Sequence, residues 1–280
     1  MTQKKSNNAR RVIVSVIVSV IVTFIASMPA GAQCAYKNTA FKSGEFLSYN
    51  TYFNWKFVWV KVGTASMSVV QTKQGGKDAF RANLITSGNK RADELFVLRD
   101  TITCYCSTAL EPLSYHKGAK EGSRYYVDDV SYSYVGGKTT IKQHRMNSKG
   151  EHTNKTETFN SCIYDMLNIF LRARSLDPSD WKKGHTEDFT IADGRKTTSA
   201  KLKYLGTTNV KADNGVKYRC LQLSYMELEK GKYKELVRFF VTDDANHLPI
   251  RLDMNLNFGS AKAFLTGMKG LKNPEGAIVK

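Results

Sequence analysis

The chain of 280 residues has 42 lysines and arginines against 25 aspartates and glutamates, which gives a formal charge of +17. This length accommodates one large domain or two small ones. The chain has five cysteines, an odd number, and it is too long to need disulfides for stability. It is therefore not a small disulfide-dependent scaffold.

The N-terminal stretch has the features of a bacterial-type secretory signal. Residues 1–11 carry four basic side chains and no acidic one, and residues 12–25 form an apolar run. Ala30 and Ala32 then form the Ala-x-Ala pattern of a cleavage site, which predicts removal of residues 1–32 as a signal peptide. The apolar run is shorter than the roughly 20 residues that a membrane-spanning helix requires, so an uncleaved N-terminal anchor is the less favoured alternative.

Cys34 raises the question of whether it is the lipidated first residue of a membrane-anchored protein. Lipidation needs a small residue immediately before the cysteine, and Gln33 occupies that position. Cleavage after Ala32 therefore predicts a soluble periplasmic protein that begins at Gln33. Loss of residues 1–32 removes four basic residues and lowers the charge to +13. A positive charge favours anionic partners, and export makes an anionic membrane surface, a polysaccharide or an acidic envelope protein more plausible than nucleic acid. We therefore expect no nucleic-acid partner. Scattered basic residues are also typical of a solvated surface.

Beyond residue 44, apolar and polar residues alternate with a period of two, which is typical of half-buried antiparallel strands. Predicted strands cover residues 45–53, 55–70, 79–88, 98–107, 124–135, 138–146, 186–191, 196–210, 216–229, 235–242, 248–258 and 260–266. Turn sequences at 136–137, 192–195 and 212–215 join consecutive strands as hairpins.

One segment, residues 161–175, has a helical period instead. Its apolar stripe consists of Ile163, Met166, Leu167, Phe170 and Leu171, and its polar face of Asp165, Asn168 and Arg172. Ser161 is the predicted N-cap, and Arg172 with Arg174 are ordinary charges of a C-terminal turn. Since an apolar stripe must be buried, we expect the helix to lie against the inner face of the sheet.

The predicted fold class is mainly β, with a large antiparallel curved sheet, a barrel or half-barrel, and one inserted amphipathic helix. A single domain is expected at residues 42–270. Residues 33–41 and 271–280 are expected to be N- and C-terminal tails.

The cysteines leave the disulfide pairing open. Cys104 and Cys106 stand two apart in a predicted strand, so their side chains share one face and run parallel, which disfavours a bond between them. A bond between Cys162 and Cys220 is conceivable. No histidine has ligand spacing near the cysteines, so we predict no metal site.

The sequence contains no nucleophile-elbow, phosphate-loop or zinc-protease motif. The histidines are spread along the chain with no acidic or cysteine signature beside them. Three adjacent acid pairs, Asp128-Asp129, Glu187-Asp188 and Asp243-Asp244, are poor candidates for glycosidase chemistry, because neighbours on a strand face opposite sides. We expect no catalytic residues, no cofactor and no enzymatic activity.

Trp55, Phe57 and Trp59 share one face of a predicted strand. Such side chains either fill a core or line an apolar cavity that a curved sheet encloses beneath a helix. Together with Ile163, Leu167 and Phe170 of the predicted helix, they are the candidate ligand-cavity residues.

Four stretches in order resemble one known family. They are VGTASMSV (62–69), LRDTITCYCSTALEPLSYHK (98–117), CIYDMLNIFLRAR (162–174) and FFVTDDANHLPIRLDMNLNFGSAKAFL (239–265). They resemble the exported bacterial domain of unknown function family 3108 over about residues 42–268, and residues 242–263 are the most specific part. The family's helix usually carries a proline and a serine near its start, where this chain has Tyr164, Asp165 and Asn168.

The resemblance implies an all-β, barrel-like or half-open sheet with an inserted helix, similar to the periplasmic lipoprotein carriers. It implies no catalytic residue. Together with the residue patterns it predicts a non-enzymatic cell-envelope protein that binds or carries a lipid or another apolar ligand, with the helix at 161–175 as plug or lid. The alternative is a packed β interaction module that binds an envelope protein or a polysaccharide.

Overall fold

The structure is a computed structural model that describes residues 34–280 apart from 56–57, 95 and 257–258. The predicted signal peptide at 1–32 and the candidate residue Phe57 lie outside the described residues. Within the described residues, no helix is both long and apolar enough to cross a membrane.

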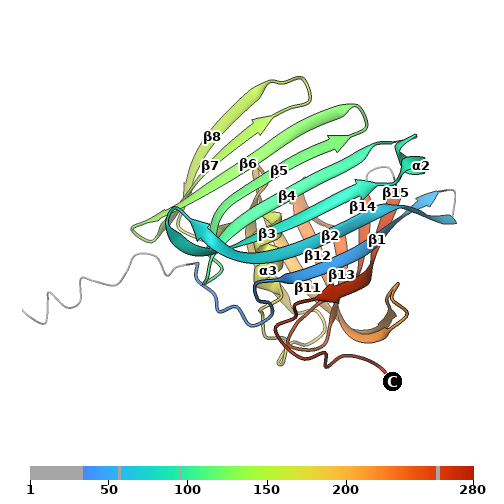
Figure 1. The fold of residues 1–280 in the computed structure, drawn as a ribbon. Helices are drawn as coiled ribbons and strands as arrows, with labels where there is room; N and C mark the ends of the chain where they lie inside the picture. The colour runs from blue at the N-terminus through green and yellow to red at the C-terminus, as the bar shows by residue number, and fades with distance from the viewer. Residues whose placement is uncertain (1–33, 56–57, 95, 257–258) are drawn as a thin grey trace, which may run out of the picture.

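Fifteen strands of the described chain form one curved sheet (Figure 1), in the order β8-β7-β6-β5-β4-β3-β2-β1-β15-β14-β13-β12-β11-β10-β9. The strands are β1 (Glu45–Trp55), β2 (Val58–Gln74), β3 (Lys77–Gly88), β4 (Leu98–Ser107), β5 (Pro112–Glu121), β6 (Arg124–Val135), β7 (Lys138–Met146), β8 (His152–Phe159), β9 (Ile163–Tyr164), β10 (Thr186–Ala192), β11 (Thr197–Lys211), β12 (Lys217–Glu229), β13 (Lys232–Thr242), β14 (Pro249–Leu256) and β15 (Gly259–Lys269). Neighbours are antiparallel except for β9 and β10, which pair in parallel. The mainly β, barrel-like fold class is confirmed.

The alternating runs predicted the long strands closely, but three strands were missed. Strand β8 is almost wholly polar, β5 begins with a proline and carries two lysines, and β9 has only two residues. The prediction of one strand at 55–70 was wrong at its start. Trp55 belongs to β1 and pairs with Val58 of β2 across the hairpin, so Trp55 and Trp59 lie on different strands.

Near the β10–β11 turn, the two ends of the sheet are joined by hydrogen bonds that involve side chains. Gly194 N donates to Gln143 Oε1 at 3.1 Å, and Thr197 Oγ1 donates to Glu157 Oε2 at 3.1 Å. Gly194 has a φ of +87°, and a Cβ at this position would lie 2.6 Å from Cβ of Asp128. Only glycine fits this approach, which closes the barrel without a continuous backbone ladder.

Two helices are described, α2 (Lys90–Asp93) and α3 (Met166–Ala173). The predicted helix start was too early, because Ile163 and Tyr164 pair with β10 and Asp165, rather than Ser161, is the N-cap. The Asp165 carboxylate accepts from the backbone N–H groups of Leu167 at 3.0 Å and Asn168 at 2.8 Å. This contact satisfies two N–H groups that lack partners within the helix.

The faces of α3 also differ from the prediction at three positions. Asp165 and Asn168, expected on the polar face, are buried, and Met166, expected in the apolar stripe, is 43% exposed. Burial of the two polar residues is possible because Asn168 Nδ2 and the Tyr132 hydroxyl both donate to Asp165 Oδ2. Leu167 and Leu171 are buried in the main core, as the stripe predicted.

Helix α3 lies inside the barrel and divides its interior (Figure 1). On one side it contacts β4 and the main core, which extends over most of the sheet. On the other side, a second apolar cluster lies on β11, β12 and β13.

Both predicted tails pack against the barrel. Phe41 and Ala277 are buried, and the C-terminal segment bonds to β12 through Arg219 N to Ala277 O at 2.8 Å.

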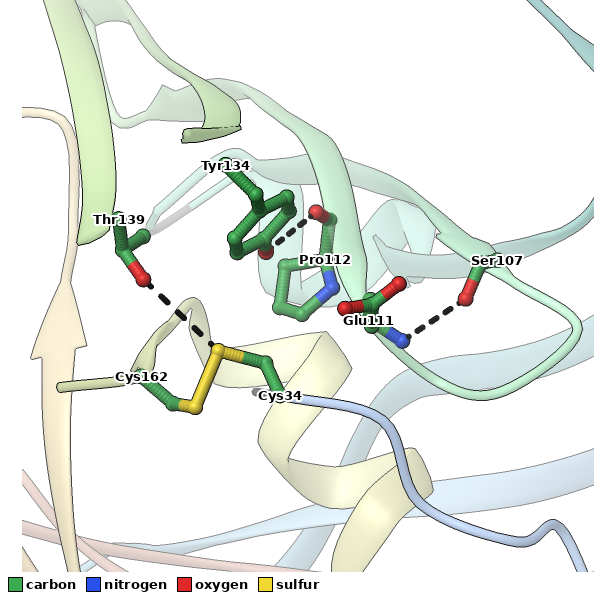
Figure 2. The surroundings of a disulfide bond; sticks show 7 residues. All are labelled: Cys34, Ser107, Glu111, Pro112, Tyr134, Thr139 and Cys162. Atoms are coloured by element: carbon green, nitrogen blue, oxygen red, sulfur yellow. Dashed lines mark hydrogen bonds between the residues drawn. A yellow bond between two sulfur atoms is a disulfide. The ribbon is translucent and has the colours of Figure 1, made fainter. Parts of the chain in front are cut away.

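One disulfide is present, between Cys34 and Cys162, with Cα atoms 5.5 Å apart (Figure 2). The suggested Cys162–Cys220 pair is therefore wrong, and Cys220 is a free, buried thiol. Cys104 and Cys106 are also free and buried on one face of β4, as their spacing predicted. Burial raises the pKa of the Cys106 and Cys220 thiols to about 12, so both stay protonated.

Candidate functional site

The candidate site is an apolar groove between α3 and the inner face of β10–β13. Alternate residues of β12 and β13 form its sheet wall, and cross-strand partners lie beside each other, namely Leu221 with Val241, Leu223 with Phe239 and Tyr225 with Val237. Leu202 of β11 and Phe189 of β10 extend this wall. A period of two in these strands is what places the apolar side chains together on one face.

Helix α3 provides the opposite wall of the groove through Met166, Ile169, Phe170 and Ala173. The rings of Phe170 and Phe239 lie 5.9 Å apart between centroids, with 41° between their planes. This contact narrows the groove, which encloses about 80 Å³. Met166, the most exposed of the four, lies where a flexible thioether side chain can change rotamer without disturbing the core.

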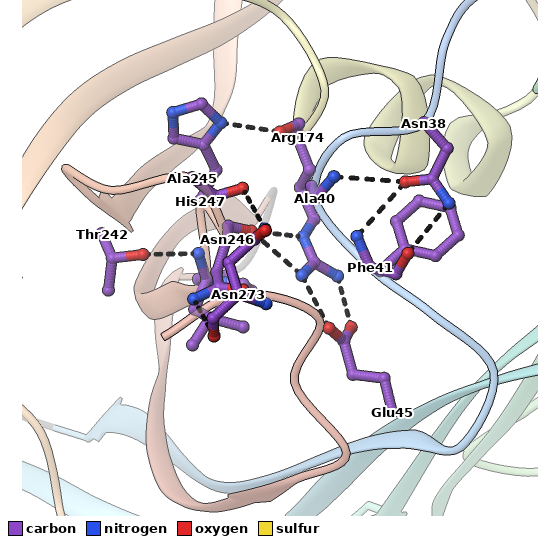
Figure 3. A network of polar contacts seen from close by, with 12 residues as sticks. Asn38, Ala40, Phe41, Glu45, Arg174, Thr242, Ala245, Asn246, His247 and Asn273 are labelled. Carbon is purple, nitrogen blue, oxygen red and sulfur yellow. Dashed lines mark hydrogen bonds and ion pairs between the residues drawn. The ribbon is translucent and has the colours of Figure 1, made fainter. Parts of the chain in front are cut away.

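The C-terminal end of α3 is held by a buried ion pair (Figure 3). Arg174 Nη1 and Nη2 lie 2.5 and 3.0 Å from the two carboxylate oxygens of Glu45, and both side chains are almost fully buried. The Arg174 guanidinium also donates to the Asn246 carbonyl at 3.1 and 3.2 Å. The bidentate geometry fixes the helix end against β1, so Arg174 is not the ordinary C-terminal charge that was predicted.

His247 lines the same end of the groove. Burial lowers the pKa of His247, so the neutral ring is favoured, and its Nδ1–H donates to the Arg174 carbonyl at 2.6 Å. The Tyr225 hydroxyl is engaged as well, since it donates to Glu227 Oε1 at 2.8 Å. Among the described lining residues, the titratable side chains of Arg174, His247 and Tyr225 are thus all bonded to partners within the protein. The groove offers an apolar surface without a free charge.

The structure brings only part of the predicted cavity set to this groove. Phe170 lines it, whereas Ile163 and Leu167 lie in the main core. Trp59 is 37% exposed near the start of β2, with Lys262 Nζ 4.2 Å from its ring centroid, so it lies away from the groove. The Trp55 side chain, like Phe57, is outside the described residues.

The groove residues of β12 and β13 were missed by sequence reasoning. The alternation that predicts a half-buried strand is present in this segment, because Leu221, Leu223 and Tyr225 alternate with Gln222 and Ser224. What the sequence could not provide was the pairing of these strands opposite the helix.

Three histidines that looked unrelated in the sequence form a ladder with Asp129 across β5–β8. His116 Nδ1 lies 2.7 Å from Asp129 Oδ1, and His144 Nδ1 lies 2.9 Å from Asp129 Oδ2. His144 Nε2 in turn lies 2.8 Å from His152 Nδ1. Wide spacing along the chain had concealed this cluster, because the pairing of four strands brings its residues together. Still, the described residues contain no group of three or more His, Cys, Asp or Glu side chains arranged to hold a metal ion.

The first acid pair behaves as strand alternation predicts. Asp128 is buried and pairs with Arg145 at 2.8 Å, whereas Asp129 faces the opposite side with the histidines. In the third pair, Asp243 is bound to Arg219, and Asp244 accepts from the Thr242 hydroxyl at 2.7 Å. These carboxylates stabilise local structure and do not converge on a common point.

The chain belongs to the family described as a protein of unknown function, DUF3108, which matches residues 48–266. This match confirms the resemblance seen in the sequence. A comparison with curated proteins gave no match.

Among solved structures, the fold is similar to a β-barrel-like protein of domain of unknown function DUF1849 from Brucella abortus. The identity is 11%, the TM-score is 0.51, and the match covers 82% of this chain and 98% of that one. A putative lipoprotein from Parabacteroides distasonis matches at 10% identity with a TM-score of 0.37, over 84% of this chain and 99% of that one. A putative exported protein with a YmcC-like fold from Bacteroides fragilis matches at 10% identity with a TM-score of 0.34, over 84% and 100%. At these identities the first similarity extends to the fold alone.

Proposed function

We propose that this protein is an exported, non-enzymatic binding protein of the cell envelope that holds an acyl chain or a similar apolar group between α3 and β10–β13. The observation that carries the proposal is a groove walled by apolar side chains, whose titratable residues are engaged within the protein. Burial of an acyl chain contributes about 0.8 kcal/mol per methylene, so such a wall retains lipid without polar recognition.

The size of the groove requires that side chains of its helix wall move when a ligand enters. Pockets that enclose a whole small ligand usually have about 300–1,000 Å³, and this groove encloses about 80 Å³. Both ends of α3 are fixed, by Asp165 at the start and by Arg174 at the end. Opening therefore takes place through side chains of the helix wall, by rotation of Phe170 in its middle away from Phe239 and of Met166 at its start toward solvent. In this account the side chains of α3, rather than the whole helix, act as the lid of the groove.

Export to the periplasm is supported by the signal features of residues 1–32 and by the Cys34–Cys162 disulfide, because disulfides persist in oxidising compartments. A Cys34 sulfur that is bonded to Cys162 is also not available for a thioether-linked lipid. These observations favour a soluble protein over a lipoprotein.

A fluorescent fatty acid and its displacement by unlabelled fatty acid test the groove. Ala173→Phe places a ring in the groove without adding charge, and we expect it to weaken probe binding at least about tenfold through lost volume. Val237→Phe repeats the test from the sheet wall. Ala92→Phe is the matched control, since Ala92 is a half-buried alanine on the other helix, α2. Equal binding by the groove variants and the control would refute the proposal.

The alternative, a packed interaction module, is favoured by one observation, which is that Phe170 and Phe239 already narrow the groove. If the probe fails to bind the native protein, while an envelope protein or polysaccharide is recovered by crosslinking without lipid, this second function replaces the first.

A further inference from the structure

Two neighbouring hairpins, β1–β2 and β14–β15, lie at one end of the barrel (Figure 1). Both carry exposed apolar side chains. On β2, Val58 is 62% exposed, Trp59 37% and Val60 39%, and Leu256 at the end of β14 is 39% exposed. Strands β1 and β15 pair directly, which places the two hairpins side by side. The four residues Val58, Trp59, Val60 and Leu256 are called the hairpin patch below.

The exposure in the hairpin patch extends to both faces of β2. Successive side chains of a strand point to opposite faces, so three consecutive exposed residues, 58 to 60, leave neither face covered. Full burial on β2 begins only at Gly63. The described start of β2 therefore extends beyond the core, and Val58, Trp59 and Val60 present apolar surface to solvent.

The charge around the hairpin patch is positive. The described charged residues over 53–62 and 253–263 are Lys61, Lys262 and Asp253, and Asp253 is paired with Arg251. Lys61 is exposed, and Lys262 Nζ lies 4.2 Å from the Trp59 ring centroid.

Helix α2 adds further cations beside β2. Asn89 Nδ2 donates to the Lys61 carbonyl at 3.0 Å, which holds the exposed Lys90 and Arg91 next to the strand. Of the two acids nearby, Asp93 is paired with Arg99, and Glu94 is exposed.

We propose that the hairpin patch docks this protein on an anionic membrane surface. Tryptophan and aliphatic side chains enter the headgroup region, while lysine stems extend along them and their amines reach lipid phosphates. A second copy of this chain fits the patch less well, because a symmetric contact would bring the same lysines together. The β1–β2 pair is also in the middle of the sheet, so it offers no free edge for backbone pairing. This inference is independent of the groove.

The test is co-sedimentation of the exported protein with vesicles of phosphatidylglycerol and phosphatidylethanolamine, compared with vesicles of phosphatidylcholine. We expect binding to the anionic vesicles that weakens as salt is raised. Lys61→Glu with Lys262→Glu should lower the affinity at least about tenfold, because each lysine near an anionic surface contributes about fivefold. Trp59→Ser with Val58→Ser should lower it similarly, and Trp59→Gln alone repeats the test with a smaller change.

The matched control is Val135→Ser with Lys138→Glu. Val135 is 77% exposed and Lys138 is exposed at the β6–β7 hairpin, at the opposite end of the barrel. The control should bind vesicles like the native protein, and all variants should unfold at the native temperature and bind the fluorescent fatty acid normally. The proposal is overturned by equal binding of native and patch variants, by an equal loss in the control, or by equal binding to phosphatidylcholine. It is also overturned if the patch variants change only the oligomeric state in analytical ultracentrifugation.

Discussion

Replacing both cysteines of the disulfide, as Cys34→Ser with Cys162→Ser, should lower the free energy of unfolding by about 5 kcal/mol. The bond closes a loop of 128 residues, and in the chain-entropy treatment the closure of such a loop removes about 17 cal/mol/K from the unfolded ensemble, or about 5 kcal/mol at 25 °C. Because whole domains are stable by about 5–15 kcal/mol, the loss is a large share of the total.

Urea unfolding followed by far-ultraviolet circular dichroism measures this loss. Cys220→Ala is the control, because it removes a buried free thiol and closes no loop; we expect a cost near 1 kcal/mol. Alkylation checks the connectivity separately. The denatured, unreduced protein should take up three labels, on Cys104, Cys106 and Cys220, and the reduced protein five.

A loss below about 1 kcal/mol in the double variant would refute the entropy argument. Five labels without reductant would refute the disulfide itself.

Two further predictions concern buried charges at the two ends of α3. Glu45→Gln leaves the Arg174 guanidinium buried without a counter-charge, and in urea unfolding it should lower the free energy of unfolding by about 3–5 kcal/mol. Asp253→Asn removes one partner of a partly exposed ion pair and should lower it by about 1 kcal/mol or less. Equal losses in the two variants would contradict the argument from burial. Burial raises the pKa of Asp165 to about 6, above its unfolded value near 4, so the folded state binds this proton more tightly. The stability that this group contributes is therefore present below pH 4, falls by about 3 kcal/mol as pH rises to 6 and stays level above that. Thermal unfolding of the native protein and of Asp165→Asn should be measured from pH 4 to 7. The difference in stability between the two proteins should change between pH 4 and 6, and a difference that stays constant with pH would contradict the prediction.

The strands could be predicted from sequence where apolar and polar residues alternate strictly. Residues 98–107 and 124–135 match β4 and β6 at both ends, because apolar residues there alternate and turn residues follow. Strand β8 was not readable, since an edge strand with polar residues on both faces has no such period.

The helix start and the site depended on tertiary contacts. Ser161 and Asp165 are both good N-caps by residue type, and the choice between them follows from the Tyr132 hydroxyl, 33 residues away, which donates to Asp165. Phe170 was found because a helical stripe is local in sequence. Its partner Phe239 comes from a distant strand, and the disulfide joins residues 128 apart, so neither contact has a local signal.

Native mass spectrometry of the protein recovered from producing cells tests the ligand-binding account most directly. The native chain should carry a lipid-sized, non-covalent adduct that is reduced or absent in Ala173→Phe and retained in Ala92→Phe. A bare native chain under gentle ionisation, or an adduct equally abundant in all three proteins, would contradict the claim that the groove between α3 and β10–β13 is the binding site.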